Sequence, residues 1–138
     1  MRILIVNGPN LNLVGTREPQ IYGNVTFERH LEALKEKSDV QIDYFQSNIE
    51  GEMINCLQTS DHDGIVLNAG GYSHTSVALR DCVAAISIPV VEVHISNLTQ
   101  RESFRHESLI SPVAVGCIFG FGMISYDLAI DYFLKNKR

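Results

Sequence analysis

The sequence predicts an α/β protein in which a five-stranded parallel sheet carries helices on both of its faces. Short runs of apolar and β-branched residues alternate with segments of helical spacing along the whole chain, which is typical of strand–helix–strand units. The chain has 138 residues, of which 45% are apolar and 20% charged. This suits one globular domain with a core of its own, so we expect residues 1–138 to form a single catalytic domain.

Five segments are expected to be strands, namely residues 2–7, 40–45, 64–68, 89–94 and 114–119. Helices are expected over residues 25–37, 49–60, 76–86 and 122–136. Right-handed crossovers between five strands in a chain of this length favour a flavodoxin-like three-layer sandwich with strand order 2-1-3-4-5. Such a sheet binds its ligand beyond the carboxyl ends of strands 1, 3 and 4.

Two of the predicted helices carry an apolar stripe, as helices that pack on a sheet do. The first helix follows Thr26, a suitable N-cap residue, and its stripe consists of Phe27, Leu31 and Leu34. The stripe of the last helix consists of Ile124, Leu128, Ala129 and Tyr132. We expect both stripes to face the sheet.

Charge and hydropathy exclude several classes of partner. The net charge is −5, and no basic stripe interleaves with aromatic residues, so we expect no nucleic-acid partner. No apolar run reaches the length that spans a membrane, and Met1 leads directly into the first predicted strand. We therefore expect no membrane partner, no signal peptide and a cytoplasmic location.

The spacing of cysteines and histidines indicates neither a disulfide framework nor a metal site. The three cysteines, Cys56, Cys82 and Cys117, lie in apolar stretches without CxxC or CxxH spacing, so we expect them to be small buried side chains. The histidines do not pair with cysteines or acids at metal-ligand spacing, and no GxGxxG or P-loop motif is present. We expect no metal and no cofactor.

A long polar loop follows the first predicted strand. It covers residues 7–23 and contains Asn7, Asn10, Asn12, Arg17 and Tyr22, whereas a strand–helix connection needs only a few residues. A free tyrosine has a pKa of about 10, too high for a base at neutral pH, but a nearby arginine stabilises the phenolate. The loop thus offers Tyr22 as a base assisted by Arg17, although arginines and tyrosines on loops are also common surface groups.

Polar residues also follow the third and fourth predicted strands. Asn68 ends the third strand and precedes His74, while Glu92 and His94 end the fourth and precede Arg105. Residues two apart on a strand share a face, so Glu92 and His94 lie together. A carboxylate fixes the tautomer of an imidazole and favours its protonated form, which makes a proton donor near neutral pH. A structural pair is the alternative, but the position at the end of a strand favours catalysis.

Asp81 lies on the same predicted helix face as His74, seven residues later. At 1.5 Å per residue it is roughly 10 Å further along, which is far for a pocket of its own chain. Asp81 would serve the site of a neighbouring subunit, or else form a surface pair with Arg80.

The four lysines of the chain lie away from the predicted site. They are Lys35 and Lys37 near the end of the first helix, and Lys135 and Lys137 near the end of the chain. Imine chemistry through a lysine is therefore not expected, and the reaction must use acid–base groups alone.

Several motifs, in this order, resemble the type II 3-dehydroquinate dehydratases of the shikimate and quinate pathways. They cover nearly the whole chain: Asn7-Gly-Pro-Asn-Leu-Asn, Gly15-Thr-Arg with Tyr22-Gly23, Phe45-Gln-Ser-Asn with Glu50-Gly-Glu, Asn68-Ala-Gly-Gly-Tyr-Ser-His-Thr-Ser, Glu92-Val-His-Ile-Ser-Asn, and Arg105-His106 leading to Ala114-Val-Gly. The resemblance implies a flavodoxin-like fold, trimers assembled into a dodecamer, and a small-molecule substrate. It also implies anti elimination of water from 3-dehydroquinate to 3-dehydroshikimate through an enolate, without a Schiff base.

The resemblance further implies a role for each matching residue. Tyr22 would be the general base, with Arg17 lowering its pKa, on a mobile lid of about residues 14–23. His94, oriented by Glu92, would be the general acid, and Asn10 would stabilise the enolate through a water molecule. The substrate would be held by Asn68, His74, the backbone amides of Ile95 and Ser96, Arg105, and Asp81 from a neighbouring subunit.

A non-enzymatic flavodoxin-like binding module is the alternative from another class. A phospho-receiver needs acidic residues after the first strand and an aspartate at the end of the third, where this chain has Asn7 and Asn68. It also needs a lysine after the fifth strand, where Gly120-Phe-Gly stands. An FMN carrier needs a Ser/Thr-rich phosphate loop after the first strand, and the segment around Pro9 does not resemble one. A colourless purified protein would count further against FMN.

Overall fold

The computed structural model describes residues 1–16, 20 and 25–137 and contains a parallel sheet of five strands. The strands are β1 (Arg2–Asn7), β2 (Gln41–Gln46), β3 (Gly64–Asn68), β4 (Val90–His94) and β5 (Gly116–Phe119). Their order in the sheet is β2-β1-β3-β4-β5, and every neighbouring pair is parallel. The flavodoxin-like order is therefore confirmed, and the strand ends differ from the predicted ones by only one or two residues.

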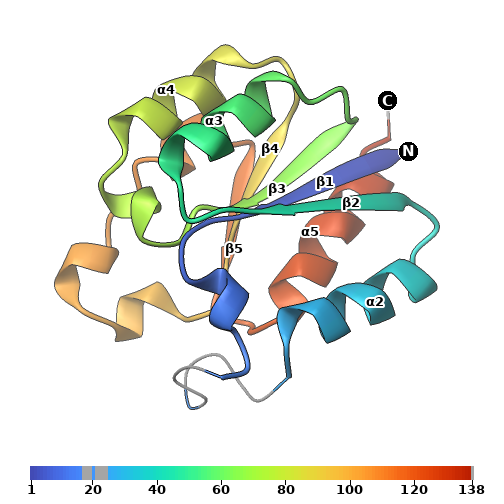
Figure 1. The fold of residues 1–138 in the computed structure, drawn as a ribbon, viewed down its shortest axis with the longest axis horizontal. Coiled ribbons are helices and arrows are strands. Elements are labelled where there is room, and N and C mark those ends of the chain that lie inside the picture. Colours follow the sequence, from blue (N-terminus) through green and yellow to red (C-terminus); the bar gives the residue numbers. More distant parts are fainter. Residues whose placement is uncertain (17–19, 21–24, 138) are drawn as a thin grey trace.

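Two helices cover each face of the sheet, which gives three layers (Figure 1). One face carries α2 (Phe27–Lys37) and α5 (Ile124–Lys135), and the other carries α3 (Glu50–Gln58) and α4 (Val77–Ala85). Thr26 caps α2 as predicted, since its side chain accepts a hydrogen bond from the backbone N–H of Arg29 at 3.3 Å; the helix itself begins at Phe27, two residues later than the predicted range.

The alternating side chains of the strands divide the core into two clusters. In β1, Ile3 and Ile5 pack with α2 and α5, while Leu4 and Val6 pack with α3 and α4. Full burial of an aliphatic side chain contributes about 1.5–3 kcal/mol, so both layers are strongly held to the sheet. The predicted stripe of α2 is confirmed, since Phe27, Leu31 and Leu34 are all buried.

The predicted stripe of α5 is wrong. Ile124, Leu128 and Tyr132 are 59%, 39% and 39% exposed, and only Ala129 of that stripe is buried. The helix instead buries a neighbouring face made of Ser125, Tyr126, Ala129, Ile130 and Phe133. This face is buried because it fits the sheet. The Phe133 ring occupies the space above Gly64 of β3, where an added Cβ would lie 2.5 Å from the ring.

The prediction of buried cysteines holds only for Cys82. Cys56 is half-buried, and Cys117 is exposed because it lies on β5, a strand at the edge of the sheet. Among the described residues, no helix is long and apolar enough to cross a membrane.

Several short 3-10 helices gather at one end of the sheet. They include η1 (Leu11–Leu13) after β1, η2 (Gly70–His74) after β3, and η3 (Leu98–Gln100) and η4 (Ser103–Arg105) after β4. A further one, η5 (Ser111–Val113), precedes β5. In Figure 1 this end lies opposite the two chain termini. The carboxyl ends of β1, β3 and β4 therefore open onto the same region, as the fold predicts.

Candidate active site

A cavity of about 120 Å³ lies beyond the carboxyl ends of β1, β3 and β4. Its described lining is Pro9, Asn10, Leu11, Asn68, Gly70, Gly71, His74, His94, Ile95, Ser96, Leu98, Arg101 and Arg105. A larger hollow of about 690 Å³ lies near the start of β4 and the ends of α4 and α5, but its described lining contains no histidine or arginine. The smaller cavity is therefore the one whose lining can transfer protons and bind an anion.

Glu92 and His94 form a buried pair beneath this cavity. They are two residues apart on β4 and are 0% and 5% exposed. His94 Nε2 lies 3.3 Å from Oε1 of Glu92, within ion-pair distance, but the contact is too poorly aligned to count as a hydrogen bond. The structure thus brings together the pair that the strand spacing predicts.

The carboxyl group of Glu92 is held in its charged form. Burial by itself would raise the pKa of Glu92, because it penalises the charge, but the contacts with His94, Ser108 and Ser111 outweigh burial and hold the pKa below its usual range. A carboxylate next to an imidazole also fixes the orientation of the ring. The pair is therefore suited to donate a proton from His94 into the cavity.

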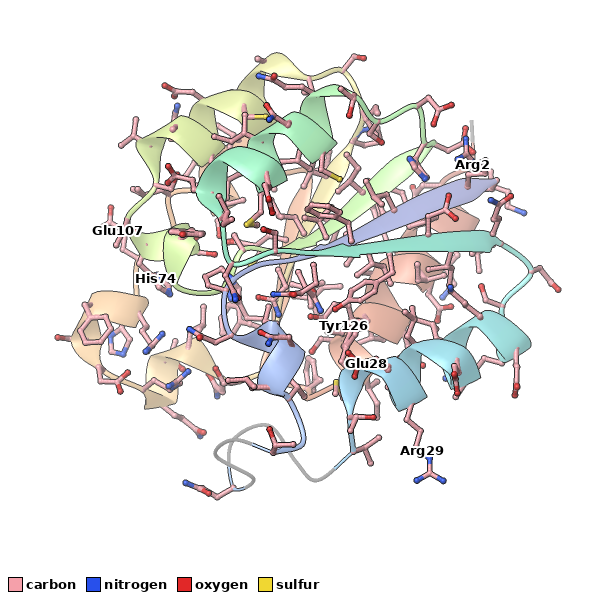
Figure 2. All side chains as sticks on the ribbon, viewed as in Figure 1. Arg2, Glu28, Arg29, His74, Glu107 and Tyr126 are labelled. Atoms are coloured by element: carbon pink, nitrogen blue, oxygen red, sulfur yellow. The ribbon has the colours of Figure 1, made fainter. Side chains whose placement is uncertain are left out.

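His74 lies beside His94 in the cavity. The two rings are stacked, with centroids 6.1 Å apart and planes inclined by 22°. Nδ1 of His74 is 2.7 Å from the backbone oxygen of Glu107, and both residues are labelled in Figure 2. A carbonyl oxygen can only accept, so Nδ1 carries a proton and Nε2 is the atom left to contact a ligand.

Two arginines from the segment after β4 complete one side of the cavity. Arg105 donates through Nε to Glu102 at 2.5 Å, and its guanidinium lies 5.0 Å from the centre of the Phe104 ring. Arg101 also lines the cavity and lies 3.9 Å from the same carboxylate. The hydrogen bond from Arg105 is the main reason that the pKa of Glu102 is lowered.

Asn68 belongs to a buried polar network as well as to the cavity. Its Nδ2 donates to the hydroxyl of Tyr126 at 2.8 Å, and that hydroxyl donates to Oδ1 of Asn7, also at 2.8 Å. Figure 2 shows Tyr126 on the face of the sheet that α2 and α5 cover. Because an amide nitrogen has two protons, Asn68 keeps one donor for a ligand while its orientation is fixed from below.

The turn after β1 brings the backbone of two strand ends very close together. The N–H of Gly8 donates to the backbone oxygen of Asn68 at 2.8 Å, and a Cβ on Gly8 would lie 2.5 Å from the backbone oxygen of Ala69. Asn10 follows with φ 69°, a left-handed conformation that asparagine tolerates. Its backbone N–H donates to Oδ1 of Asn48 at 3.0 Å. The cavity floor is thus held by hydrogen bonds between β1, β2 and β3.

Most predicted site residues meet in this cavity. Asn10, Asn68, His74, His94, Ile95, Ser96 and Arg105 line it, and Glu92 contacts His94 from below. Asp81 does not line it; this aspartate lies on α4 and pairs with Arg80 at 3.1 Å. Arg17 and Tyr22, and with them most of the predicted lid, lie outside the described residues.

Cationic side chains line the cavity, although the protein as a whole has a net charge of −5. The described lining of the cavity contains two arginines and two histidines and no aspartate or glutamate. This distribution suits an anionic ligand. Within the described part of the chain, no group of three or more His, Cys, Asp and Glu side chains is arranged to hold a metal ion.

Two residues that contact the Glu92 carboxylate were missed by sequence reasoning. Ser108 and Ser111 donate to it, although they are 16 and 19 residues further along the chain. Neither periodicity nor motif spacing connects residues so far apart. The one local signal is Ser108-Leu-Ile-Ser111-Pro112, in which the Ser108 side chain accepts from two backbone N–H groups, as in a turn.

Comparison with known proteins places the chain in a family. The family model described as dehydroquinase class II matches residues 1–134. A protein of Bacillus licheniformis named 3-dehydroquinate dehydratase is 54% identical over 99% of this chain and 97% of its own length. A protein of the same name from an Exiguobacterium strain is 51% identical over 100% of this chain and 97% of its own length. The crystal structure of a type II dehydroquinase from Butyrivibrio crossotus superposes with a TM-score of 0.93, at 43% identity and with 97% of each chain covered. The chain therefore belongs to the class II dehydroquinases.

Proposed function

We propose that this protein is a 3-dehydroquinate dehydratase that removes water from 3-dehydroquinate to give 3-dehydroshikimate. The observation that carries the proposal is the buried Glu92–His94 pair beneath an arginine-lined cavity at the carboxyl edge of the sheet. Membership of the class II dehydroquinases, and relatives that bear the name of this activity, support it. The pathway would be that of shikimate or of quinate, and the location cytoplasmic.

The reaction would be an anti elimination in two steps. Tyr22, as a phenolate stabilised by Arg17, takes the proton from C2 of the substrate, and the electron pair moves into the C3 carbonyl to give an enolate. Asn10 stabilises the enolate oxygen through a water molecule. The enolate then expels the C1 hydroxyl, which leaves as water with the proton of the His94 imidazolium. The lid of about residues 14–23 would close to bring Tyr22 to the substrate.

The remaining cavity residues would bind the substrate in its reactive orientation. Asn68, His74, Arg105 and the backbone amides of Ile95 and Ser96, which line the cavity, would together hold the substrate. Asp81 would reach the site of a neighbouring subunit, because in its own chain it lies outside the cavity lining.

Self-association into trimers and then a dodecamer is part of the proposal. The support from this chain is an exposed apolar surface at one edge of the molecule, formed by Phe119, Phe121, Ile124, Leu128 and Tyr132 of β5, α5 and the turn between them. Large exposed apolar side chains on neighbouring elements are typical of contacts between subunits. The surface also flanks β5, which has β4 as its partner on only one side in the described sheet.

Incubation with 3-dehydroquinate and sodium borohydride tests the imine-free mechanism. The described cavity lining contains no lysine, so borohydride should neither inactivate the enzyme nor leave a reduced adduct detectable by mass spectrometry. After the reagents are removed, the treated enzyme should convert fresh 3-dehydroquinate to 3-dehydroshikimate at the rate of an untreated control. Absence of product in both samples would refute the proposed activity, and inactivation with a covalent adduct would refute the mechanism.

A further inference from the structure

The segment between η4 and β5 contacts His74 of the cavity and the carboxylate of Glu92, the neighbour of His94. Its Glu107 backbone oxygen binds Nδ1 of His74, and the N–H of Leu109 donates to the backbone oxygen of Ser73 at 2.7 Å. Ile110 is fully buried in the core on the α3–α4 side, and the N–H of Val115 donates to Val90 of β4 at 2.8 Å. The segment is thus fixed on both sides of the two serines that reach Glu92.

Ser108 has only one way to use its proton. Its Oγ accepts hydrogen bonds from the backbone N–H groups of Ile110 at 3.1 Å and Ser111 at 3.2 Å. With both acceptor positions engaged, the hydroxyl must donate, and it lies 2.9 Å from Oε2 of Glu92 with a closer contact to Oε1. Ser108 therefore stabilises the charged carboxylate and disfavours a protonated one.

Ser111 contacts the same carboxylate from the next turn. Its Oγ is 3.0 Å from Oε1 and 2.8 Å from Oε2 of Glu92. The thiol of Cys117 on β5 adds a weaker donor, with Sγ 3.7 Å from Oε2. The carboxylate is therefore surrounded by donors from three parts of the chain: His94 on its own strand, the two serines, and Cys117.

We propose that Ser108 and Ser111 are positioning residues that act on the reaction through Glu92. Their hydroxyls keep this carboxylate charged and in one orientation, so that it holds the imidazolium of His94 toward the substrate. The inference rests on the proposed function, because it assigns the pair the task of delivering a proton. The other charged or titratable groups facing His94 in the described cavity are His74, Arg101 and Arg105.

Four variants separate this role from a merely structural one. Ser108→Ala and Ser111→Ala remove one donor each, and Ser108→Thr keeps the hydroxyl. Ser103→Ala is the matched control, because Ser103 is an exposed serine on the same segment. One hydrogen bond to a charged group changes an equilibrium by about ten- to a hundred-fold. We expect kcat to fall by about that factor in each alanine variant with little change in KM, and to stay near wild type in Ser108→Thr and Ser103→Ala.

A double-mutant cycle tests whether the serines act through Glu92. In a Glu92→Gln background, Ser108→Ala should cause little further loss of kcat, because the carboxylate on which it acts is gone. A loss as large as in the wild-type background would show that the serine acts independently and would overturn the proposal. Should Ser108→Ala fail to fold, the Ser111→Ala cycle with the same background decides the question.

Titration of the Glu92 carboxyl gives a readout that does not depend on turnover. Carbon-13 NMR of glutamate-labelled protein, with the Glu92 signal assigned from Glu92→Gln, should show a higher Glu92 pKa in both alanine variants and an unchanged one in Ser103→Ala. Unchanged Glu92 titration together with unchanged kcat would refute the inference. If the wild type does not dehydrate 3-dehydroquinate, the proposed function fails, while the titration still decides whether the serines hold the charge.

Discussion

Glu92 shows how hydrogen bonding can outweigh burial in setting the charge of a single side chain. Its carboxyl group is fully buried, which favours the neutral form, and yet its pKa is lowered because His94 and two serine hydroxyls contact it. A buried charge is tolerated only where its partners remain in place. In the proposed mechanism, the proton donor His94 therefore depends on side chains that lie outside the cavity lining.

The base is the second residue on which the account depends. Tyr22→Phe removes the phenolate while keeping the ring, so kcat should fall by about 10²–10⁴, the usual contribution of a positioned base. Substrate binding should change little, because the proposed contacts with the substrate lie on other residues. Stopped-flow turnover and equilibrium binding of 3-dehydroquinate would measure the two effects separately, and activity near wild type would exclude Tyr22 as the base.

At the scale of elements, the close approach of the strand ends shapes the cavity floor. Gly8 after β1 and Ala69 after β3 are so close that a Cβ on Gly8 would meet a backbone oxygen at 2.5 Å. A backbone atom cannot rotate away as a flexible side chain would. The positions of Asn10 and of Asn68, one on each side of this contact, are therefore linked.

Gly8→Ala should both destabilise the fold and impair the site. Overpacking of this kind costs about 1–3 kcal/mol, and the displaced backbone leads directly to the cavity residue Gly70. Gly51→Ala on α3 is the control, because an added Cβ there meets nothing within 4 Å. Thermal unfolding and kcat/KM would measure the two effects. Equal stability and activity of the two variants would show that the close approach is unimportant.

The buried face of an element was predictable from the sequence where its apolar residues follow one simple period. The helix α5 was predicted, but its buried face was not. Strands such as residues 64–68 are continuous apolar runs, and Thr26 marks the start of α2 through a local cap. In α5, apolar residues occupy two faces, and local spacing cannot tell which of them meets the sheet. The choice is made by distant partners, namely Gly64 under Phe133 and the amides of Asn7 and Asn68 around Tyr126.

The candidate site was likewise predictable where the fold topology brings residues together, and not where contacts between distant segments do. Residues at strand ends, such as His94 and Asn68, are brought together by topology alone, so the fold class predicts their meeting. Ser108 and Ser111 come from a connection without regular spacing, and their contact with Glu92 exists only in the folded chain. The roles proposed for all of these residues stay predictions, and Arg17 and Tyr22 lie outside the described residues.

At the scale of the whole molecule, the exposed apolar face of α5 and β5 predicts assembly. Ile124→Glu combined with Leu128→Glu should lower the molar mass measured by light scattering, because a charge on each side chain opposes burial between subunits. If Asp81 serves a neighbouring subunit, turnover should fall as well. Glu32→Lys on the exposed surface of α2 is the control and should leave both unchanged. A monomer with full activity would refute the role of Asp81 across subunits.

The central claim is that the cavity at the carboxyl edge of the sheet is a dehydratase site in which His94 supplies the proton. Its most direct test is the ultraviolet absorbance of the product enone after 3-dehydroquinate is added to the wild type and to His94→Gln. We expect the absorbance to rise with the wild type and the rate to be about 10²–10⁴ lower in the variant. No rise with folded wild-type protein, or an equal rate in His94→Gln, would contradict the claim.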